Sequence, residues 1–297
     1  MKKLLLLLVA IAPLALISCG GNEQNQSGSA NASASATSTA VDAFPWDFPQ
    51  DVIIEAEPGQ LVLAPYTSYP SAIKDGDDLN KAVLIFYKTT FEKGDKTSSA
   101  LGSEKAQIPN ALIIPLKKGE KAKVGDILLT WWQGGSGMQR AIVLDASNPE
   151  QPKVNFLDLS FDRGSQADKE SMGEKFGNKE LEPNSFQIVP DGEWVPGAQV
   201  ACRADGDWEA GTLIREQGGK VLVSGFASHV KAYDKNDCKL IPFNEDIKVG
   251  DMVHAVFVDG YDDGYKVTAV DKKAGTVTCE KNGRSKVYTK PNVTKVL

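Results

Sequence analysis

The sequence has few of the residue types from which catalytic and metal sites are usually built. It contains two histidines, His229 and His254, and neither lies near a Ser, Cys, Asp or Glu in a pattern typical of an active site. The acidic runs at residues 75–78 and 259–264 lack the spacing and the closing Glu of a calcium-binding loop. Tight turns are expected there, with a weak calcium site as the alternative. The sequence therefore predicts no enzyme activity, no cofactor and no metal.

The sequence also lacks an apolar stretch long enough to cross a membrane as a helix. The longest, at residues 4–17, is shorter than the roughly 20 residues that such a helix needs. Lys2 and Lys3 precede this stretch, and a small residue and Cys19 follow it, which is the order of parts in a cleavable signal peptide. Removal of residues 1–18 takes away these two lysines and changes the net charge from −6 to −8. This acidic balance argues against a nucleic-acid partner, which needs a basic surface.

The end of the predicted signal peptide, Leu-Ile-Ser-Cys at residues 16–19, resembles the bacterial lipobox. In that motif the cysteine thiol is diacylated, and the cysteine becomes the new N-terminus. The resemblance implies a lipid anchor on Cys19, and the alternative is secretion with an unmodified thiol. Gly20 is not the aspartate that retains lipoproteins in the inner membrane of enteric bacteria. The resemblance therefore implies an exported protein that is anchored in the outer membrane, on a leaflet that the motif does not specify.

The composition changes sharply after the first 43 residues. Residues 20–43 are small and polar and cannot bury enough apolar surface to offset their chain entropy, so residues 19–43 are expected to form a disordered tether. From residue 44 onward, short runs rich in Val, Ile, Leu and aromatic residues alternate with Gly, Asp, Asn and Pro. Only residues 166–176 suggest a helix, and a short one. The predicted fold class is all-β.

Two short motifs recur in the folded part. A glycine that leads into a strand occurs at Gly59, Gly125, Gly197 and Gly250. An asparagine that leads into a closing strand occurs at Asn110, Asn184, Asn236 and Asn292, and the next opening Gly follows the first three of these after 15, 13 and 14 positions. This spacing predicts a repeat with units at residues 44–122, 123–194, 195–247 and 248–297. Units of this size fit small, bent antiparallel barrels.

The third unit resembles a Tudor or agenet module. The resemblance rests on a first strand, an acidic turn, Trp208, a small residue and a second strand within residues 195–243, and residues 248–297 match less well, with Tyr261 in place of the Trp. It implies a series of small SH3-like barrels. Because Glu209 and Gly225 stand where the ligand cage of that family has aromatic residues, the resemblance implies a fold and no particular ligand.

Two of the remaining cysteines lie on strands of the third unit that would pair in an SH3-like barrel. Cys202 is on the first strand and Cys238 on the closing strand, and their counterparts in the fourth unit, Ala255 and Val293, are apolar. The two cysteines form either a disulfide that closes a loop of 36 residues, and stabilises by roughly 3–4 kcal/mol, or a pair of buried thiols. Cys279 is expected in a core.

Aromatic residues at the turns are the candidate ligand contacts. Trp131 and Trp132 end one strand, so alternation places one ring in the core and the other in solvent. The remaining candidates occupy or face the equivalent turns of the later units: Trp208, Phe226, Tyr233, Tyr261 and Tyr265. Such turns border the usual ligand groove of SH3-like folds and suit peptides or sugars. The alternative is that these rings pack between units. The aromatic segment at residues 44–50 is expected to pack on the first unit.

The sequence supports two hypotheses about function. The first is a lipid-anchored envelope protein that binds a protein partner, or peptidoglycan, through the turn aromatics. The second is a structural spacer or assembly lipoprotein whose aromatic residues are buried between units. Loss of a ligand without loss of stability, after substitution of Trp208 and Tyr261, is expected only under the first hypothesis.

Overall fold

A computed structural model of the chain describes residues 44–69, 73, 82–132, 137–158 and 178–297. The predicted signal peptide, Cys19, the tether at residues 19–43, the acidic run at 75–78 and the helix at 166–176 lie outside the described residues. The described part belongs to one compact unit, Ala40–Leu297. Among the described residues, no helix is long and apolar enough to cross a membrane.

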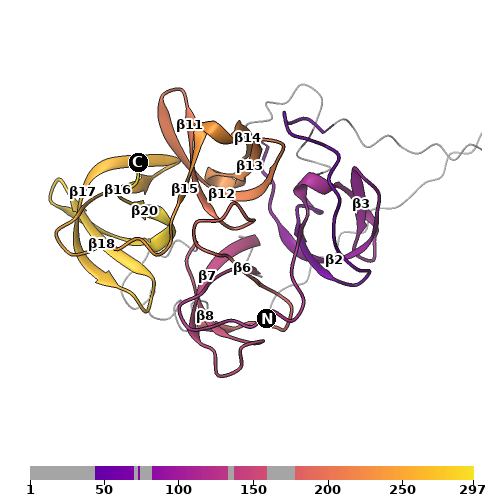
Figure 1. The fold of residues 1–297 in the computed structure, drawn as a ribbon, viewed down its shortest axis with the longest axis horizontal. Helices are drawn as coiled ribbons and strands as arrows, with labels where there is room; N and C mark the ends of the chain where they lie inside the picture. Colours follow the sequence, from indigo (N-terminus) through magenta and orange to yellow (C-terminus); the bar gives the residue numbers. More distant parts are fainter. Residues whose placement is uncertain (1–43, 70–72, 74–81, 133–136, 159–177) are drawn as a thin grey trace, which may run out of the picture. The chain divides into compact units, whose positions relative to one another are not determined.

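The described residues form antiparallel sheets, which confirms the all-β prediction (Figure 1). Their strands fall into four consecutive sets of five. The first set consists of β1 (Leu61–Ala64), β2 (Tyr87–Gly94), β3 (Ser98–Leu101), β4 (Ala106–Pro109) and β5 (Ile114–Pro115). The second consists of β6 (Ile127–Trp132), β7 (Gly137–Asp145), β8 (Lys153–Phe156), β9 (Asn178–Glu180) and β10 (Gln187–Ile188).

The other two sets lie in the C-terminal part of the chain. The third consists of β11 (Gln199–Ala204), β12 (Asp207–Gln217), β13 (Lys220–Ser224), β14 (Val230–Asp234) and β15 (Cys238–Ile241). The fourth consists of β16 (Met252–Phe257), β17 (Gly260–Asp271), β18 (Thr276–Lys281), β19 (Arg284–Thr289) and β20 (Val293–Thr294). A single pairing between β12 and β17 joins these two sets into one ten-stranded sheet.

All four sets have the same strand order. In each, the first four strands pair consecutively and the fifth pairs with the first, so that the orders are β5-β1-β2-β3-β4, β10-β6-β7-β8-β9, β15-β11-β12-β13-β14 and β20-β16-β17-β18-β19. No sheet is closed. A 3-10 helix precedes the fifth strand in three sets: η2 (Asn110–Leu112), η5 (Lys235–Asp237) and η6 (Lys290–Asn292). Each of these helices contains one of the recurring closing asparagines.

The recurring opening glycine has the same structural role in every set. At Gly59, Gly125, Gly197 and Gly250 the φ angle lies between 80° and 98°, in the left-handed region that favours glycine. Each of these glycines donates its backbone N–H to a carbonyl of the second strand of its set, at Phe91, Val143, Leu213 and Val267 respectively. A β-bulge begins at each of these four acceptor residues. The sequence motif thus marks the point at which the first strand meets the bend of the second.

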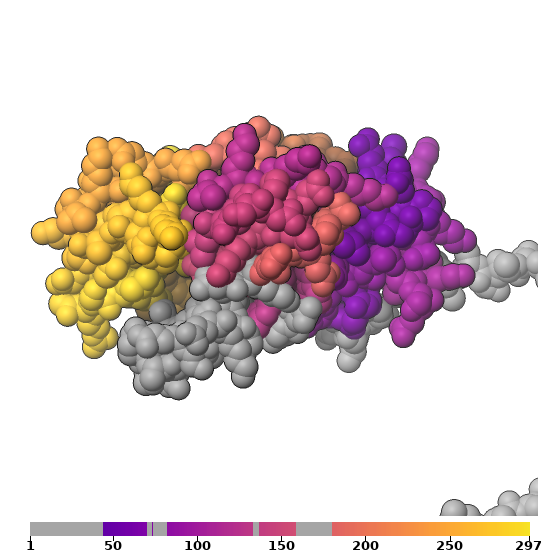
Figure 2. All heavy atoms as spheres, turned by 90° about the horizontal axis from the view of Figure 1, so that it is seen from below, coloured from indigo at the N-terminus to yellow at the C-terminus, as the bar shows by residue number. Residues whose placement is uncertain are grey.

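The hydrophobic cores do not follow the four sets one by one. Buried side chains of the first and third sets form one cluster, which includes Leu63 and Ile114 from the first set and Leu213 and Val230 from the third. The fourth set has a core of its own, and much of the second set forms another. The second and fourth sets are also in contact. Asn155 Nδ2 donates a hydrogen bond to the carbonyl of Ala274 over 3.1 Å, and Figure 2 shows residues of the two sets in contact.

The aromatic segment at residues 44–50 contacts the third set, a contact that the sequence does not predict. Trp46 Nε1 donates to the carbonyl of Val230 on β14 over 2.8 Å, and Asp47 pairs with Lys220 on β13. Phe44, Trp46 and Phe48 are all buried. The chain bends at residues 46–48, and the three rings belong to the core that the first and third sets share.

Candidate functional site

The two tryptophans at the end of β6 are both half-buried. Trp132 faces the core of the second set, where its ring centroid lies 6.2 Å from that of Phe156. Trp131 packs against the core shared by the first and third sets, and Lys88 Nζ lies 5.0 Å from its ring centroid. Alternation separates the two rings as expected, but the ring predicted to face solvent is covered by a neighbouring set instead.

The two tyrosines of β17 are structural. Tyr265 is 7% exposed and lies in the core of the fourth set, with its ring edge against Tyr288. The hydroxyl of Tyr261 accepts a hydrogen bond from Gln199 Nε2 over 2.9 Å and donates to the carbonyl of Pro291 over 3.2 Å. Since Gln199 belongs to the third set and Pro291 to the fourth, Tyr261 connects two sets. Neither tyrosine therefore lies where it could make the ligand contact that the sequence predicted.

The Tyr261 hydroxyl is the end of a longer polar chain. Arg140 on β7 is buried and makes three hydrogen bonds through its guanidinium to the carboxylate of Asp158, and its Nη1 donates to Gln199 Oε1 over 2.5 Å. Gln199 then donates to Tyr261. This chain runs through the second, third and fourth sets, and burial raises the pKa of Tyr261, so its hydroxyl stays protonated.

Trp208, at the turn between β11 and β12, is half-buried and already lies beside two cations of its own set. The guanidinium carbon of Arg203 is 4.8 Å from a Trp208 ring centroid, and Lys239 Nζ is 4.9 Å from it. Such stacking holds the ring in place through cation–π attraction. Part of the ring remains exposed, so Trp208 stays a candidate contact.

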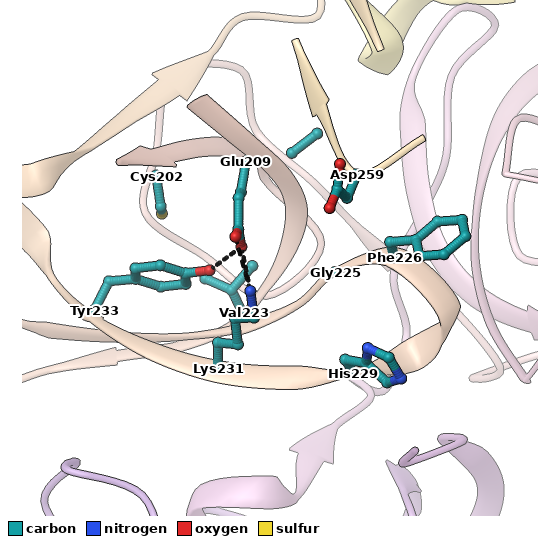
Figure 3. A pocket seen from close by; sticks show the side chains of 10 residues that line it. Cys202, Glu209, Val223, Gly225, Phe226, His229, Lys231, Tyr233 and Asp259 are labelled. Carbon is teal, nitrogen blue, oxygen red and sulfur yellow. Dashed lines mark hydrogen bonds and ion pairs between the residues drawn. The ribbon is translucent and has the colours of Figure 1, made fainter. Parts of the chain in front are cut away.

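Phe226 and Tyr233, the remaining two candidates, lie at one pocket of about 50 Å³. Strands β12 to β14, the loop between β13 and β14, and the turn between β16 and β17 enclose it (Figure 3). The residues that line it are Cys202, Glu209, Ala210, Val223, Gly225, Phe226, His229, Lys231, Tyr233 and Asp259. We call the pocket that these residues line the β13–β14 pocket. It is far smaller than the roughly 300–1,000 Å³ of sites for drug-sized ligands and suits the tip of one side chain.

A carboxylate organises the interior of the β13–β14 pocket. Both Glu209 oxygens contact Lys231 Nζ, at 2.8 and 2.7 Å, and the Tyr233 hydroxyl donates to Glu209 Oε2 over 2.6 Å (Figure 3). Burial, the hydrogen bond to Glu209 and the negative charges of Glu209 and Asp259 raise the pKa of Tyr233. Tyr233 therefore stays neutral and remains a donor. Among the described residues, the Asp259 carboxylate has no hydrogen-bond or ion-pair partner, which leaves one net negative charge at the pocket.

The rim of the pocket is apolar and its backbone is strained. Phe226 is 54% exposed and extends away from Glu209 (Figure 3). It is followed by Ala227 and Ser228, which both have positive φ, at 55° and 61°. Val258, which precedes the lining residue Asp259, is 58% exposed with a φ of 61°. A β-branched residue rarely adopts this conformation, and strain of this kind is typical of functional loops.

Cys202 and Cys238 are joined by a disulfide bond between β11 and β15, where they are paired residues. Cys202 also lines the β13–β14 pocket, so this bond fixes the strand behind Glu209. Cys279 is a free, fully buried thiol in the core of the fourth set, as expected from the sequence. Burial raises the pKa of Cys279 to about 11, which makes it a poor nucleophile.

Sequence reasoning missed the polar half of the pocket. The sequence marks Glu209 only as a departure from an aromatic pair and Asp259 only as part of an acidic turn, and it indicates no role for Lys231. One signal was available: Lys231 and Tyr233 are two residues apart on a strand and so share a face. Which carboxylates meet that face depends on the pairing of β12 with β13 and with β17, which no local pattern specifies.

Comparison of the chain with models of known protein families finds no match, and comparison with curated proteins finds none either. In the described part of the chain, no group of three or more His, Cys, Asp or Glu side chains is arranged to hold a metal ion. The acidic run at residues 259–264 forms the turn and the start of β17, and Asp262 pairs there with Lys281 over 2.5 Å. The proposal for function therefore depends on the geometry of the pocket.

Proposed function

We propose that the protein is a lipid-anchored binding protein of the cell envelope, built from four small SH3-like barrels, that holds a basic side chain of a protein partner in the β13–β14 pocket. The lipobox-like residues 16–19 support the anchor. The observation that carries the binding function is the combination of an exposed Phe226 at the rim with the partner-free carboxylate of Asp259, which is also exposed and lines the pocket.

Three repeated features support the SH3-like architecture. Each set has the order in which the fifth strand pairs with the first, each has a bulge at the same place in its second strand, and three have a 3-10 helix before the fifth strand. Small barrels obtain their curvature from such bulges. The proposed units are residues 44–122, 123–194, 195–247 and 248–297.

The chemistry of the pocket favours a cationic group. A Lys or Arg side chain can place its charge between Asp259 and Glu209, while the Tyr233 ring lines the pocket beside it. Its apolar stem then lies near Phe226 at the rim, and aromatic anchors of this kind dominate many protein interfaces. The volume of about 50 Å³ is too small for an enclosed cofactor but admits the end of one side chain.

A second candidate function is that of a spacer or assembly lipoprotein without a dedicated ligand. The contacts of Trp131 and Tyr261 between sets favour it, because these candidate aromatics stabilise the assembly of the sets. The two candidates differ in what they expect of Phe226. A binding residue is needed for capture of a partner, whereas a half-exposed residue of a spacer is dispensable.

The test is a quantitative capture experiment with a soluble mature chain in which Cys19 is replaced by Ser. Wild type, Phe226→Ala, Asp259→Asn and the control Ile53→Ala are incubated with envelope extract, and captured proteins and peptidoglycan fragments are quantified by mass spectrometry. Ile53 is the matched control because it is 77% exposed and does not line the pocket. We expect one partner to be lost at least tenfold with both pocket variants, in line with a hot-spot residue, and to be retained by Ile53→Ala.

Two results would contradict the binding function. One is capture of the same molecules by all four proteins, and the other is the absence of any captured molecule. Either result favours the spacer. The thermal midpoints of the variants are measured alongside, so that loss of capture through unfolding is recognised.

A further inference from the structure

A second and larger pocket lies in the fourth set, away from the residues that line the β13–β14 pocket. It has a volume of about 230 Å³. The chain between β15 and β16, the turn between β17 and β18, η6 and β20 enclose it. The residues that line it are Pro242, Phe243, Asn244, Glu245, Asp246, Ile247, Val270, Lys272, Val277, Lys290 and Val293. We call it the linker pocket, because residues 242–247 connect the third and fourth sets.

The floor of the linker pocket is apolar. Four buried side chains form it, and they come from the linker, β18 and β20: Phe243, Ile247, Val277 and Val293. An apolar group that enters the pocket therefore contacts a wall that is already packed and does not need to open a core. At this volume the pocket is below the usual range for drug-sized ligands and suits one apolar side chain with a small polar group beside it.

Two lysines lie on the rim, and each has an acidic residue in its neighbourhood, Asp246 near Lys272 and Asp191 near Lys290. Among the described residues, neither Lys272 nor Lys290 makes an ion pair or a side-chain hydrogen bond. Lys290 is half-buried, and burial lowers its pKa; Asp191 opposes this change, and the positive charge of Lys272 adds to it. A lysine that loses hydration and lies near a second lysine is stabilised by an arriving anion.

The acidic residues near the linker pocket already have partners. Glu245 accepts hydrogen bonds from Thr294 Oγ1 and from the backbone N–H of Lys295, at 2.9–3.0 Å. Asp246 pairs with Lys248 over 2.7 Å. Asp191 accepts from the backbone N–H groups of residues 243 and 244, at 2.6 and 3.2 Å. These carboxylates hold the linker in place, and none of them makes an ion pair with Lys272 or Lys290, so the two ammonium groups keep donors for an added anion.

We propose that the linker pocket binds the C-terminal carboxylate of a partner polypeptide whose last residue is apolar. The side chain of that residue enters the apolar floor, and its carboxylate contacts Lys272 and Lys290. Hydrogen bonds between an ammonium and a carboxylate are about twice as strong as neutral ones. Capture of a chain terminus in this way is a recurring mode of peptide recognition. This proposal is independent of the β13–β14 pocket, because the two pockets share no residue.

The test uses a fluorescently labelled tetrapeptide, Gly-Ala-Gly-Leu, with a free C-terminal carboxylate and, as the comparison, the same peptide as its C-terminal amide. Fluorescence anisotropy is measured with the soluble mature chain, with Lys290→Gln and Lys272→Gln, and with the control Lys273→Gln. Lys273 is exposed and adjacent in sequence, but it does not line the pocket. Removing one charge-assisted hydrogen bond is expected to weaken binding about tenfold or more.

We expect the acid peptide to bind at least about tenfold more tightly than the amide and to lose this advantage in both pocket variants. Lys273→Gln should bind like wild type. Equal binding of acid and amide, unchanged binding by Lys290→Gln and Lys272→Gln, or no binding of the acid at about 1 mM would each overturn the proposal. Octanoate is added as a competitor, and binding of octanoate as tightly as the peptide would overturn the assignment to a polypeptide terminus. Since Lys272 is exposed, its variant remains informative if Lys290→Gln fails to fold.

Discussion

Removal of one hydroxyl from the polar chain between the sets is expected to destabilise the protein measurably. Tyr261→Phe keeps the ring and deletes the group that accepts from Gln199 over 2.9 Å and donates to the Pro291 carbonyl. Gln199 is 1% exposed, so its amide loses an acceptor that water cannot easily replace. A buried donor left without its partner costs about 1–3 kcal/mol, and we expect the free energy of unfolding to fall by about 2 kcal/mol.

The assay is urea unfolding followed by tryptophan fluorescence, with Tyr265→Phe as the matched control. Both substitutions remove a tyrosine hydroxyl from β17, but the Tyr265 hydroxyl donates only to Asp262, over a long 3.4 Å. The control is therefore expected to lose less than about 0.5 kcal/mol. Similar losses for both variants would refute the reasoning, as would a loss below about 0.5 kcal/mol for Tyr261→Phe.

The same variant predicts a pH effect with a definite sign. The folded protein raises the pKa of Tyr261, so the folded state holds this proton more tightly than the unfolded chain does. The contribution to stability is fully present below the ordinary tyrosine pKa of about 10 and decreases as the pH rises above it. The difference in unfolding free energy between wild type and Tyr261→Phe should therefore shrink above about pH 10.

The disulfide, a buried asparagine and the free cysteine each have an effect that can be measured. The double variant Cys202→Ala, Cys238→Ala opens a loop of 36 residues and should lower the free energy of unfolding by roughly 3–4 kcal/mol, measured against wild type under non-reducing conditions; an equal midpoint would contradict it. Asn110 is fully buried and makes three side-chain hydrogen bonds, so Asn110→Ala should cost about 3 kcal/mol in the same assay, and a cost below about 1 kcal/mol would show that they are replaceable. Cys279 should resist iodoacetamide at pH 8 until urea unfolds the chain, because it is buried with a pKa near 11; fast labelling of the folded protein would disprove this.

The repeat could be predicted from the sequence because its opening glycine and closing asparagine have local structural roles. The opening glycine is needed where φ is positive, as at Gly250 with φ 98°, and its N–H always meets the bulge of the second strand. The closing asparagine of three sets lies in a 3-10 helix before the fifth strand. Asn110 shows why this residue recurs in the first set: its side chain bonds to Val52 and Asp95 carbonyls and to Ser99, and so ties three segments of the chain together.

Contacts between sets could not be predicted from the sequence, because alternation specifies which face of a strand a residue occupies and not what covers that face. Alternation correctly predicts that the rings of Trp131 and Trp132 face opposite sides of β6. It does not predict that the core of the first and third sets lies against Trp131. The segment at residues 44–50 buries three aromatic rings, and adjacency in sequence does not indicate its contact with Val230 of the third set. The apolar face of β13 and β14 lies more than 170 residues further on, as the pairing of Asp47 with Lys220 shows.

Contacts between sets also explain why some candidate aromatic residues are buried and others are exposed. Tyr261 and Trp208 occupy equivalent turns, and their sequence contexts are alike. Tyr261 is taken up by the contact between the third and fourth sets, whereas Phe226, on a loop that this contact does not cover, stays exposed beside Asp259. An aromatic residue at a turn is therefore available to a partner only where the repeat leaves the turn uncovered. In a tandem array, the contacts between units decide which turns are left uncovered. Here the candidate binding pocket lies where β12 of the third set pairs with β17 of the fourth.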